Sequence, residues 1–148
     1  MNIKYHTLEQ KLNRLKEQII KLEEVKKEIK TVNDLKKDFR KEALIERLFQ
    51  IALEMVLDIG RMIISIENLP RPEQNDEIFK ILADGKIISQ NFAKKAFGMG
   101  RFRNILVHGY MVIKEEQVFE NLKKLDLFKI FVKFIGEYLA KKSHLKKI

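Results

Sequence analysis

The chain of 148 residues is 45% hydrophobic and 34% charged, with only 2 prolines and 6 glycines, a composition that is typical of a folded helical protein and excludes a disordered one. Its length fits a single domain, residues 1–148, and its lack of cysteine excludes disulfides, thiolate metal sites and cysteine nucleophiles. The net charge of +9 attracts polyanions, but it does not choose among RNA, an anionic membrane and an acidic protein.

The sequence contains no apolar run of the roughly 18 residues that a membrane span needs. Residues 1–7 also lack the continuous apolar core of a signal peptide. We therefore expect a cytoplasmic protein that does not associate with a membrane.

The first predicted element is a long amphipathic helix over residues 6–30. Its apolar residues recur mainly at alternating steps of four and three, and its other faces are nearly all Lys, Glu and Gln. Fewer than four heptads favour packing within the domain over pairing with a second chain. The apolar positions are Leu8, Leu12, Leu15, Ile19, Leu22 and Ile29.

The second predicted helix spans about residues 35–66, with Asn33 or Asp34 as its N-cap. From Leu48 onward it is apolar almost all round, as expected for the central helix of a bundle. Its polar residues are spaced by three or four and share one narrow stripe. This polar stripe comprises Arg47, Gln50, Glu54, Asp58, Arg61 and Ser65.

Two interpretations of the polar stripe are open. It is either a solvent-facing strip joined by pairs such as Glu54 with Arg61 or Arg47, or the wall of a polar cleft or subunit contact. Because burying polar groups costs free energy unless they are paired, a stripe on the most apolar helix is a candidate site.

Downstream of the prolines at 70 and 72, a short helix is expected between an N-cap at Asn75 or Asp76 and a C-terminus at 84–85. Ser89 is expected to cap another short helix that ends at Gly98.

A helical region with a regular apolar face follows Lys114, and the basic tail, 141–148, is expected to fray. Five or six helices without a strand predict an all-α helical bundle. The apolar face of the last region consists of Val118, Leu122, Leu125, Phe128, Phe131, Ile135 and Tyr138.

The segment RNILVHGY, residues 103–110, concentrates polar chemistry. On a helix, Asn104 and His108 are four residues apart and Arg103 and Tyr110 are seven apart, so these side chains fall on one side. Gly109 is expected to end the helix and turn Tyr110 back toward them. These four polar side chains form a candidate site.

The chemistry of this segment suits cleavage of RNA without a metal. Arg103 offers a permanent charge that fits a phosphate, and His108 can give or take a proton near neutral pH. An imidazole that deprotonates a ribose 2′-hydroxyl starts attack on the adjacent phosphorus, while the guanidinium stabilises the charge of the transition state.

The residues alone leave other interpretations open. The chain could be a non-catalytic basic module that binds RNA, a nucleotide or a protein, or an assembly protein in which the motif only caps a helix. His6 and His144 are weaker candidates than His108 because they lie near the termini. No metal or cofactor is expected, since metal-ligand spacing is absent and Gly98 and Gly100 lack Walker-type neighbours.

Three blocks of the sequence, ERLFQIALEMVLDIGRMIIS, PEQNDEIFKILADGKIIS and FGMGRFRNILVHGYMVI, strengthen the catalytic interpretation. In their order and spacing, over roughly residues 40–140, the chain resembles the HepT-like branch of the HEPN superfamily. The signature of that branch is Arg, four to six residues, His, any residue, Tyr. Here Arg103, His108 and Tyr110 match it.

The resemblance implies a HEPN-like, dimeric, metal-independent ribonuclease that acts as the toxin of a type VII toxin–antitoxin system. It implies an antitoxin of the MNT-type nucleotidyltransferase class, which silences the toxin by transferring AMP to Tyr110. It also gives the polar stripe a role: Asp58 is expected to orient Arg103, with Asn104, Glu54 and Arg61 as further supporting residues.

A homodimer is expected for a chemical reason as well. Cleavage of this kind is helped by both a base and an acid, whereas one chain has a single well-placed histidine. A twofold axis that faces two motifs across one cleft supplies the second His108.

Overall fold

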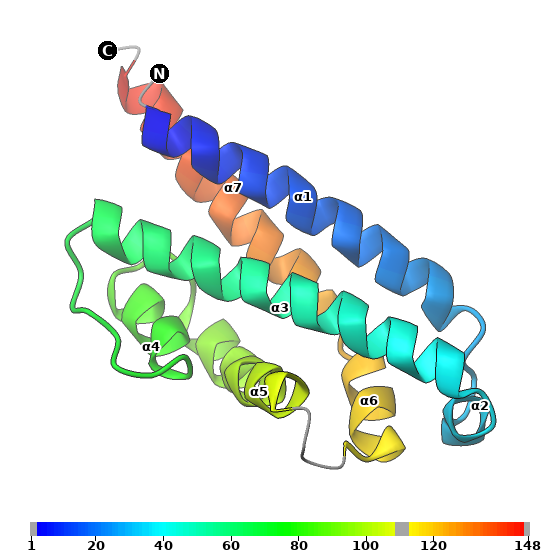
Figure 1. Cartoon of the computed structure of the whole chain (residues 1–148). Coiled ribbons are helices and arrows are strands. Elements are labelled where there is room, and N and C mark those ends of the chain that lie inside the picture. Colours follow the sequence, from blue (N-terminus) through cyan, green and yellow to red (C-terminus); the bar gives the residue numbers. More distant parts are fainter. Residues whose placement is uncertain (1–2, 109–112, 147–148) are drawn as a thin grey trace.

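The computed structural model describes residues 3–108 and 113–146, with side chains as far as Ser143. These residues form seven helices and no strand (Figure 1), which confirms the predicted all-α bundle but exceeds the expected five or six helices. The helices are α1 (Ile3–Lys26), α2 (Val32–Lys36), α3 (Phe39–Ile66), α4 (Glu77–Asp84), α5 (Gln90–Val107), α6 (Glu115–Leu122) and α7 (Asp126–Lys146).

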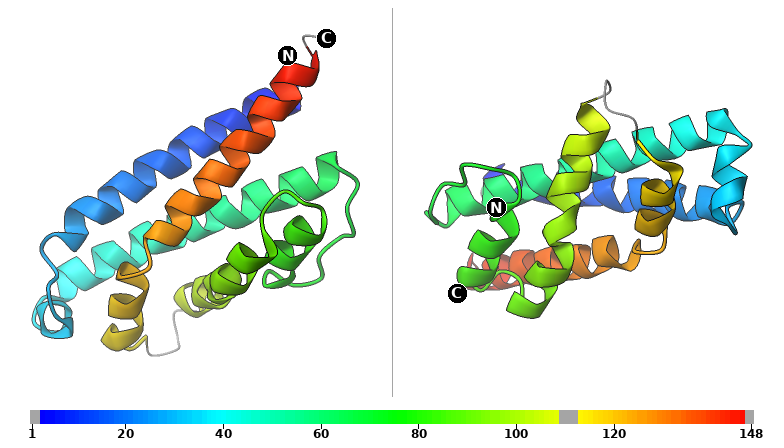
Figure 2. Two further views of the ribbon diagram at one scale, coloured as in Figure 1. Left: turned by 180° about the vertical axis from the view of Figure 1, so that it is seen from behind. Right: turned by 90° about the horizontal axis from the view of Figure 1, so that it is seen from below.

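Helix α3 is the central element of the bundle, as its sequence predicts. It contacts α1, α2, α4, α5 and α6. Helix α1 runs antiparallel to α3, and α7 returns along α1 so that both ends of the described chain lie together (Figures 1 and 2). Helices α4 and α5 cover the other side of α3, and α5 crosses it steeply (Figure 2).

The first helix packs within the domain. Every apolar position named for it is buried, and Leu8, Leu15 and Leu22 have no exposed surface. The helix ends at Lys26 rather than at residue 30, and Ile29 is buried in the turn that follows.

The N-cap expected for the long second helix was wrong. Asp34 lies inside the short helix α2, where its carboxylate accepts hydrogen bonds from the backbone N–H groups of Lys30 and Thr31. Helix α3 begins instead after Asp38, whose side chain accepts from the next turn of backbone N–H groups. The N-caps at Thr31 and Asp38 divide the segment into two helices.

The expected end of a short helix at Gly98 was also wrong. Ser89 caps α5 as predicted, with its hydroxyl 3.0 Å from the backbone nitrogen of Phe92. The helix then continues through Gly98 to Val107. It does so because its buried apolar face, which includes Met99 and Phe102, outweighs the helix-weakening effect of glycine.

The C-terminal region consists of two helices, and its predicted apolar face is entirely buried. Helix α7 extends to Lys146, so the backbone of the basic tail is helical over most of the segment expected to fray. Glu67, which follows α3, holds this end of α7: its carboxylate accepts from the Tyr138 hydroxyl at 2.8 Å and pairs with Lys142 at 2.6 Å. These contacts, with burial opposing them, lower the pKa of Glu67.

Three carboxylates meet where α3 begins beside α6. Burial, followed by the charges of Glu115 and Glu46, raises the pKa of Glu42 to about 7. Glu42 therefore releases its proton in the folded protein at a higher pH than in the unfolded chain, and its ionisation weakens folding as the pH rises from about 4.5 to about 7.

We predict that Glu42→Gln stabilises the protein at pH 8 and changes stability little at pH 4, where the carboxyl is largely protonated in both states. Thermal unfolding from pH 4 to pH 8 measures the difference. Glu24→Gln, which removes an exposed carboxylate of α1 outside this cluster, is the control substitution. Equal melting temperatures for the parent and Glu42→Gln at pH 8 would contradict the prediction.

No helix among the described residues is long and apolar enough to span a membrane.

Candidate active site

The residues of the Arg, His and Tyr motif lie at the C-terminal end of α5. Arg103 and Asn104 occupy its last two turns, and His108 is its C-cap, exposed and with non-helical backbone angles. The backbone N–H of His108 donates to the carbonyl of Asn104 at 3.1 Å. Gly109 and Tyr110 lie outside the described residues, so the expected return of Tyr110 toward the cluster stays a prediction.

Arg103 projects from α5 toward the polar stripe of α3. Its Nη2 lies 3.6 Å from Oε1 of Glu54, and its Nη1 donates to Oδ1 of Asn104 at 3.3 Å. Gln50 donates to the same Glu54 oxygen at 3.4 Å. With a side chain 29% exposed, Arg103 is held on two sides and still reaches the surface.

The hydrogen bonds of Arg103 do not use all of its donors. Both of its contacts are long, and its buried Nε–H has no acceptor among the described residues. Since a guanidinium carries five N–H donors, the group keeps the capacity to bind an oxyanion.

The carboxylate beside Arg103 is Glu54, so the expectation that Asp58 orients Arg103 was wrong. Asp58 is half exposed and pairs with Lys11 of α1 instead. One helical turn separates the two carboxylates, and the crossing of α5 over α3 brings Arg103 to the earlier one. Spacing within α3 could not distinguish them.

A second set of contacts extends from Asn104 to the far end of the polar stripe. Asn104 Oδ1 also accepts from Nδ2 of Asn75 at 3.3 Å, and Asn75 Oδ1 accepts from Nη2 of Arg61. A surface cavity of about 320 Å³ opens here, lined by Arg61, Asn104 and residues 72–75. Side chains from α3, α5 and the loop before α4 thus form one polar cluster.

Both interpretations of the polar stripe hold for different parts of it. Arg47, Asp58 and Ser65 are exposed, as a solvent-facing strip requires. Glu54 and Arg61, the latter also exposed, contact the motif side of the molecule. The pairs suggested within the stripe, Glu54 with Arg61 or Arg47, do not form among the described residues.

Asn75 is a polar contributor that the sequence indicated only as a possible helix cap. Asp76 occupies the N-cap position of α4, which leaves the Asn75 amide to join Arg61 to Asn104. Gly100 permits this approach, because a Cβ there would lie 3.3 Å from backbone atoms of Asp76. Gly100 is therefore closely packed against the loop before α4, a role that the sequence could not assign.

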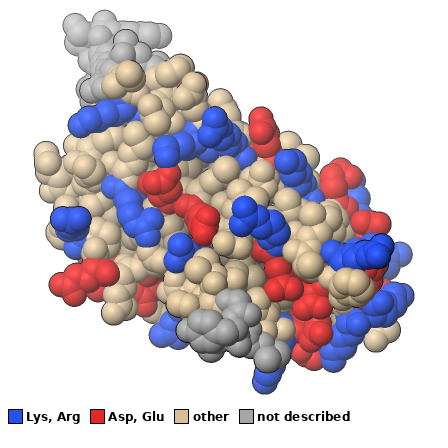
Figure 3. Space-filling model, in the orientation of Figure 1, with Lys and Arg blue, Asp and Glu red and all other residues tan. Residues whose placement is uncertain are grey.

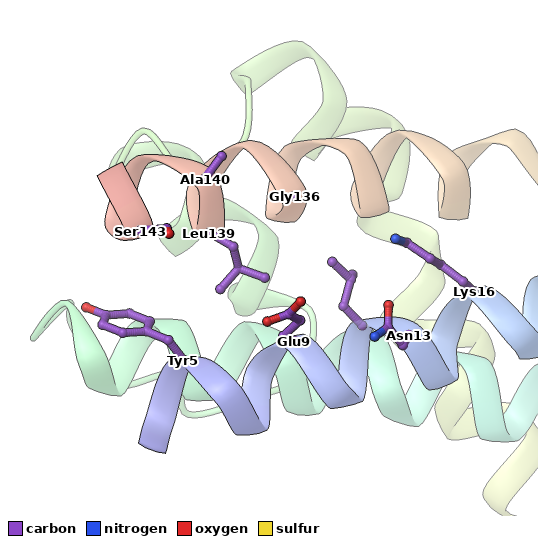
Figure 4. A pocket seen from close by; sticks show the side chains of 9 residues that line it. Tyr5, Glu9, Asn13, Lys16, Gly136, Leu139, Ala140 and Ser143 are labelled. Atoms are coloured by element: carbon purple, nitrogen blue, oxygen red, sulfur yellow. The ribbon is translucent and has the colours of Figure 1, made fainter. Parts of the chain in front are cut away.

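On the face in Figure 3, lysines and arginines alternate with carboxylates rather than forming one patch. Two further cavities lie away from the motif. One, of about 330 Å³, lies between α1 and α7 near Tyr5 and Gly136 (Figure 4). The other, of about 810 Å³, lies beside Glu67 and Lys142. No group of three or more His, Asp or Glu side chains among the described residues could hold a metal.

Comparison with known proteins identifies relatives of this chain. The model of the family described as Ribonuclease HepT-like matches residues 6–135. The tRNA nuclease HepT of Aphanizomenon flos-aquae (strain 2012/KM1/D3) is 30% identical over 110 residues, which cover 74% of this chain and 75% of that protein.

Solved structures show the same fold at lower sequence identity. A tri-AMPylated HEPN toxin of Shewanella oneidensis, in complex with MNT antitoxin, is 24% identical and gives a TM-score of 0.78 over 93% of this chain and 99% of its own. YutE of Bacillus subtilis, a cytosolic protein of unknown function, is 20% identical with a TM-score of 0.76, covering 93% of this chain and 91% of its own.

We predict that replacement by alanine affects stability differently at two glycines of α5. Gly98→Ala should stabilise the protein by about 0.5–1 kcal/mol, because Gly98 is exposed with open space around it and alanine favours helix. Gly100→Ala should destabilise it relative to Gly98→Ala and shift the side-chain amide resonances of Asn75 and Asn104.

Chemical denaturation and amide NMR of the two variants measure these effects. An unchanged Asn75 resonance in Gly100→Ala, with stability equal to that of Gly98→Ala, would contradict the assigned packing role of Gly100.

Proposed function

The chain belongs to the HepT-like ribonuclease family and is a ribonuclease, and from this premise we propose that Arg103 and His108 cleave RNA without a metal in the toxin of a toxin–antitoxin pair. The observation that carries the proposal is the arrangement at the end of α5. Glu54 and Asn104 hold Arg103 there, and the exposed His108 caps the same helix. A phosphate binder and a proton-transfer group are thereby fixed to one rigid element.

In the proposed reaction the His108 imidazole accepts the proton of a ribose 2′-hydroxyl. The 2′-oxygen forms a bond to the adjacent phosphorus, and the bond from phosphorus to the 5′-oxygen of the next nucleotide breaks. The leaving oxygen takes a proton from an acid, so the products are a 2′,3′-cyclic phosphate and a 5′-hydroxyl. Arg103 stabilises the negative charge that builds up on the phosphoryl oxygens.

We infer a homodimer as the active form. The described site contains one histidine, whereas the reaction uses a base and an acid. Two copies related by a twofold axis would place a second His108 on the leaving-group side and double the local positive charge. We propose the cytoplasm as the location of this dimer, since RNA is available there.

The proposed partner is an MNT-type nucleotidyltransferase antitoxin. Support comes from the Shewanella oneidensis HEPN toxin, which has the same fold, is AMPylated and is bound to such an antitoxin. In the proposed modification the phenolic oxygen of Tyr110 attacks the α-phosphorus of ATP, pyrophosphate leaves, and the phenolic proton passes to solvent. The added phosphate carries negative charge two residues from His108, which would oppose RNA binding.

The catalytic assignment is tested by cleavage of RNA in EDTA. We predict that His108→Ala and Arg103→Ala each lower the cleavage rate by about 10²–10⁴-fold, because each removes a group that acts in the transition state. Both variants should remain folded by circular dichroism and dimeric by light scattering.

Lys94→Ala, an exposed cation on the same helix, should keep parental activity. Folded, unmodified parent protein that binds RNA in a strongly salt-dependent manner, but cuts none of a panel of RNAs, would replace the ribonuclease mechanism with a non-catalytic binding role. Active monomers would overturn the dimer.

The modification is tested by producing the protein together with an MNT-type nucleotidyltransferase and ATP. We predict that the parent gains the mass of one or more AMP groups and loses RNA cleavage. Tyr110→Phe should gain no mass and stay active, since the accepting hydroxyl is gone. Tyr5→Phe is the matched control that should still be modified, and AMP on Tyr110→Phe would show that another residue is the acceptor.

A further inference from the structure

The cavity beside Arg61 is an additional candidate site next to the motif. Its volume is about 320 Å³, and three elements form it: α3, the loop before α4, and α5. Pro72 is the one apolar side chain in its lining. Such a polar cavity suits a charged or strongly hydrogen-bonding ligand rather than an apolar one.

Arg61 brings a positive charge to this cavity. Its guanidinium contacts the amide oxygen of Asn75, which is neutral. Within the described part of the chain, Arg61 forms no ion pair with a carboxylate. A guanidinium positioned by a neutral amide keeps its charge and most of its donors for an incoming anion.

The position of Arg61 relative to Arg103 indicates which anion this is. Only two side chains separate the two guanidinium groups, because Asn75 contacts Arg61 and Asn104 contacts both Asn75 and Arg103. The same hydrogen bonds fix the two cations relative to each other. A polyanion whose charges repeat at short intervals, such as the backbone of RNA, can contact both at once.

We propose that this cavity binds the phosphate group next to the scissile phosphate of single-stranded RNA, with Arg61 as the phosphate ligand and Asn75 as the residue that positions Arg61. The inference rests on the proposed function, since the scissile phosphate is the one bound by Arg103. It assigns the cavity a role in holding the RNA strand in register, separate from proton transfer by His108.

Replacing Glu73 should change RNA affinity in the opposite direction to replacing Arg61. Its side chain also lines the cavity, and its negative charge opposes a phosphate there. Neutralising it should therefore strengthen RNA binding by about two- to threefold, whereas neutralising Arg61 should weaken it.

The decisive experiment uses a DNA oligonucleotide with a single ribonucleotide, because its one 2′-hydroxyl confines cleavage to one phosphate. An uncharged methylphosphonate replaces the neighbouring phosphate on the 5′ side or on the 3′ side in turn. For the parent, we expect one of these replacements to lower kcat/KM about tenfold, mainly through KM. For Arg61→Gln the same replacement should change kcat/KM less than twofold.

Arg71→Gln is the matched control, because Arg71 is an exposed arginine of the same loop outside the cavity lining. It should respond to the methylphosphonate as the parent does. An equal loss of activity in the parent and in Arg61→Gln at both positions would overturn the phosphate site.

Failure of the proposed mechanism is distinguishable from failure of this site. If the parent cuts neither the probe nor any of the panel of RNAs, the 2′-hydroxyl mechanism fails, and binding to a fully 2′-O-methylated RNA still tests Arg61. There, Arg61→Gln should reduce the slope of log affinity against log salt by about 0.7, the value for one phosphate of a single strand. An unchanged slope in Arg61→Gln, with Glu73→Gln also without effect, would overturn the site independently of catalysis.

Discussion

From Leu48 onward α3 is apolar almost all round and has to be covered by other helices, and this constraint organises the molecule. Helix α1 and the pair α4 and α5 cover opposite sides of it. The aromatic ring of Phe49 joins the layers, lying 5.3 Å from the Phe102 ring in an edge-to-face contact and 6.3 Å from that of Phe128. The polar stripe of α3 meets polar groups of these covering helices, because Asp58 pairs with Lys11 of α1 and Glu54 lies beside a cation of α5.

Arg103 is that cation of α5, and its environment reconciles burial with reactivity. A guanidinium placed among apolar helices needs compensation, which Glu54 supplies as a charge and Asn104 as an amide oxygen. Neither contact is short enough to saturate the group. The result is a cation that packing positions and whose remaining donors suit the charge developing on a phosphate during cleavage.

The loop before α4 connects this cation to a second one. Gly100 lets the backbone around Asp76 approach α5, and the adjacent Asn75 then reaches both Asn104 and Arg61. A network of neutral amides between two arginines keeps like charges at a fixed separation without neutralising either. This arrangement suits an extended polyanion. RNA, the substrate of a ribonuclease, is such a polyanion, so the family of the chain and the polar cavity beside Arg61 point to the same ligand.

The sequence by itself determined the all-α class, the central position of α3 and the buried apolar faces of α1 and α7, because helical periodicity is a local property. It also identified the motif residues, because their chemistry is local as well. The sequence did not predict that α3 begins after Asp38 or that α5 continues past Gly98, since capping geometry and a buried face outweighed single-residue propensities. Only the tertiary structure decided that Glu54, not Asp58, meets Arg103 and that Asn75 joins Arg61 to Asn104. Those contacts depend on the angle at which α5 crosses α3 and on the close approach at Gly100, and neither is encoded in the spacing along one helix.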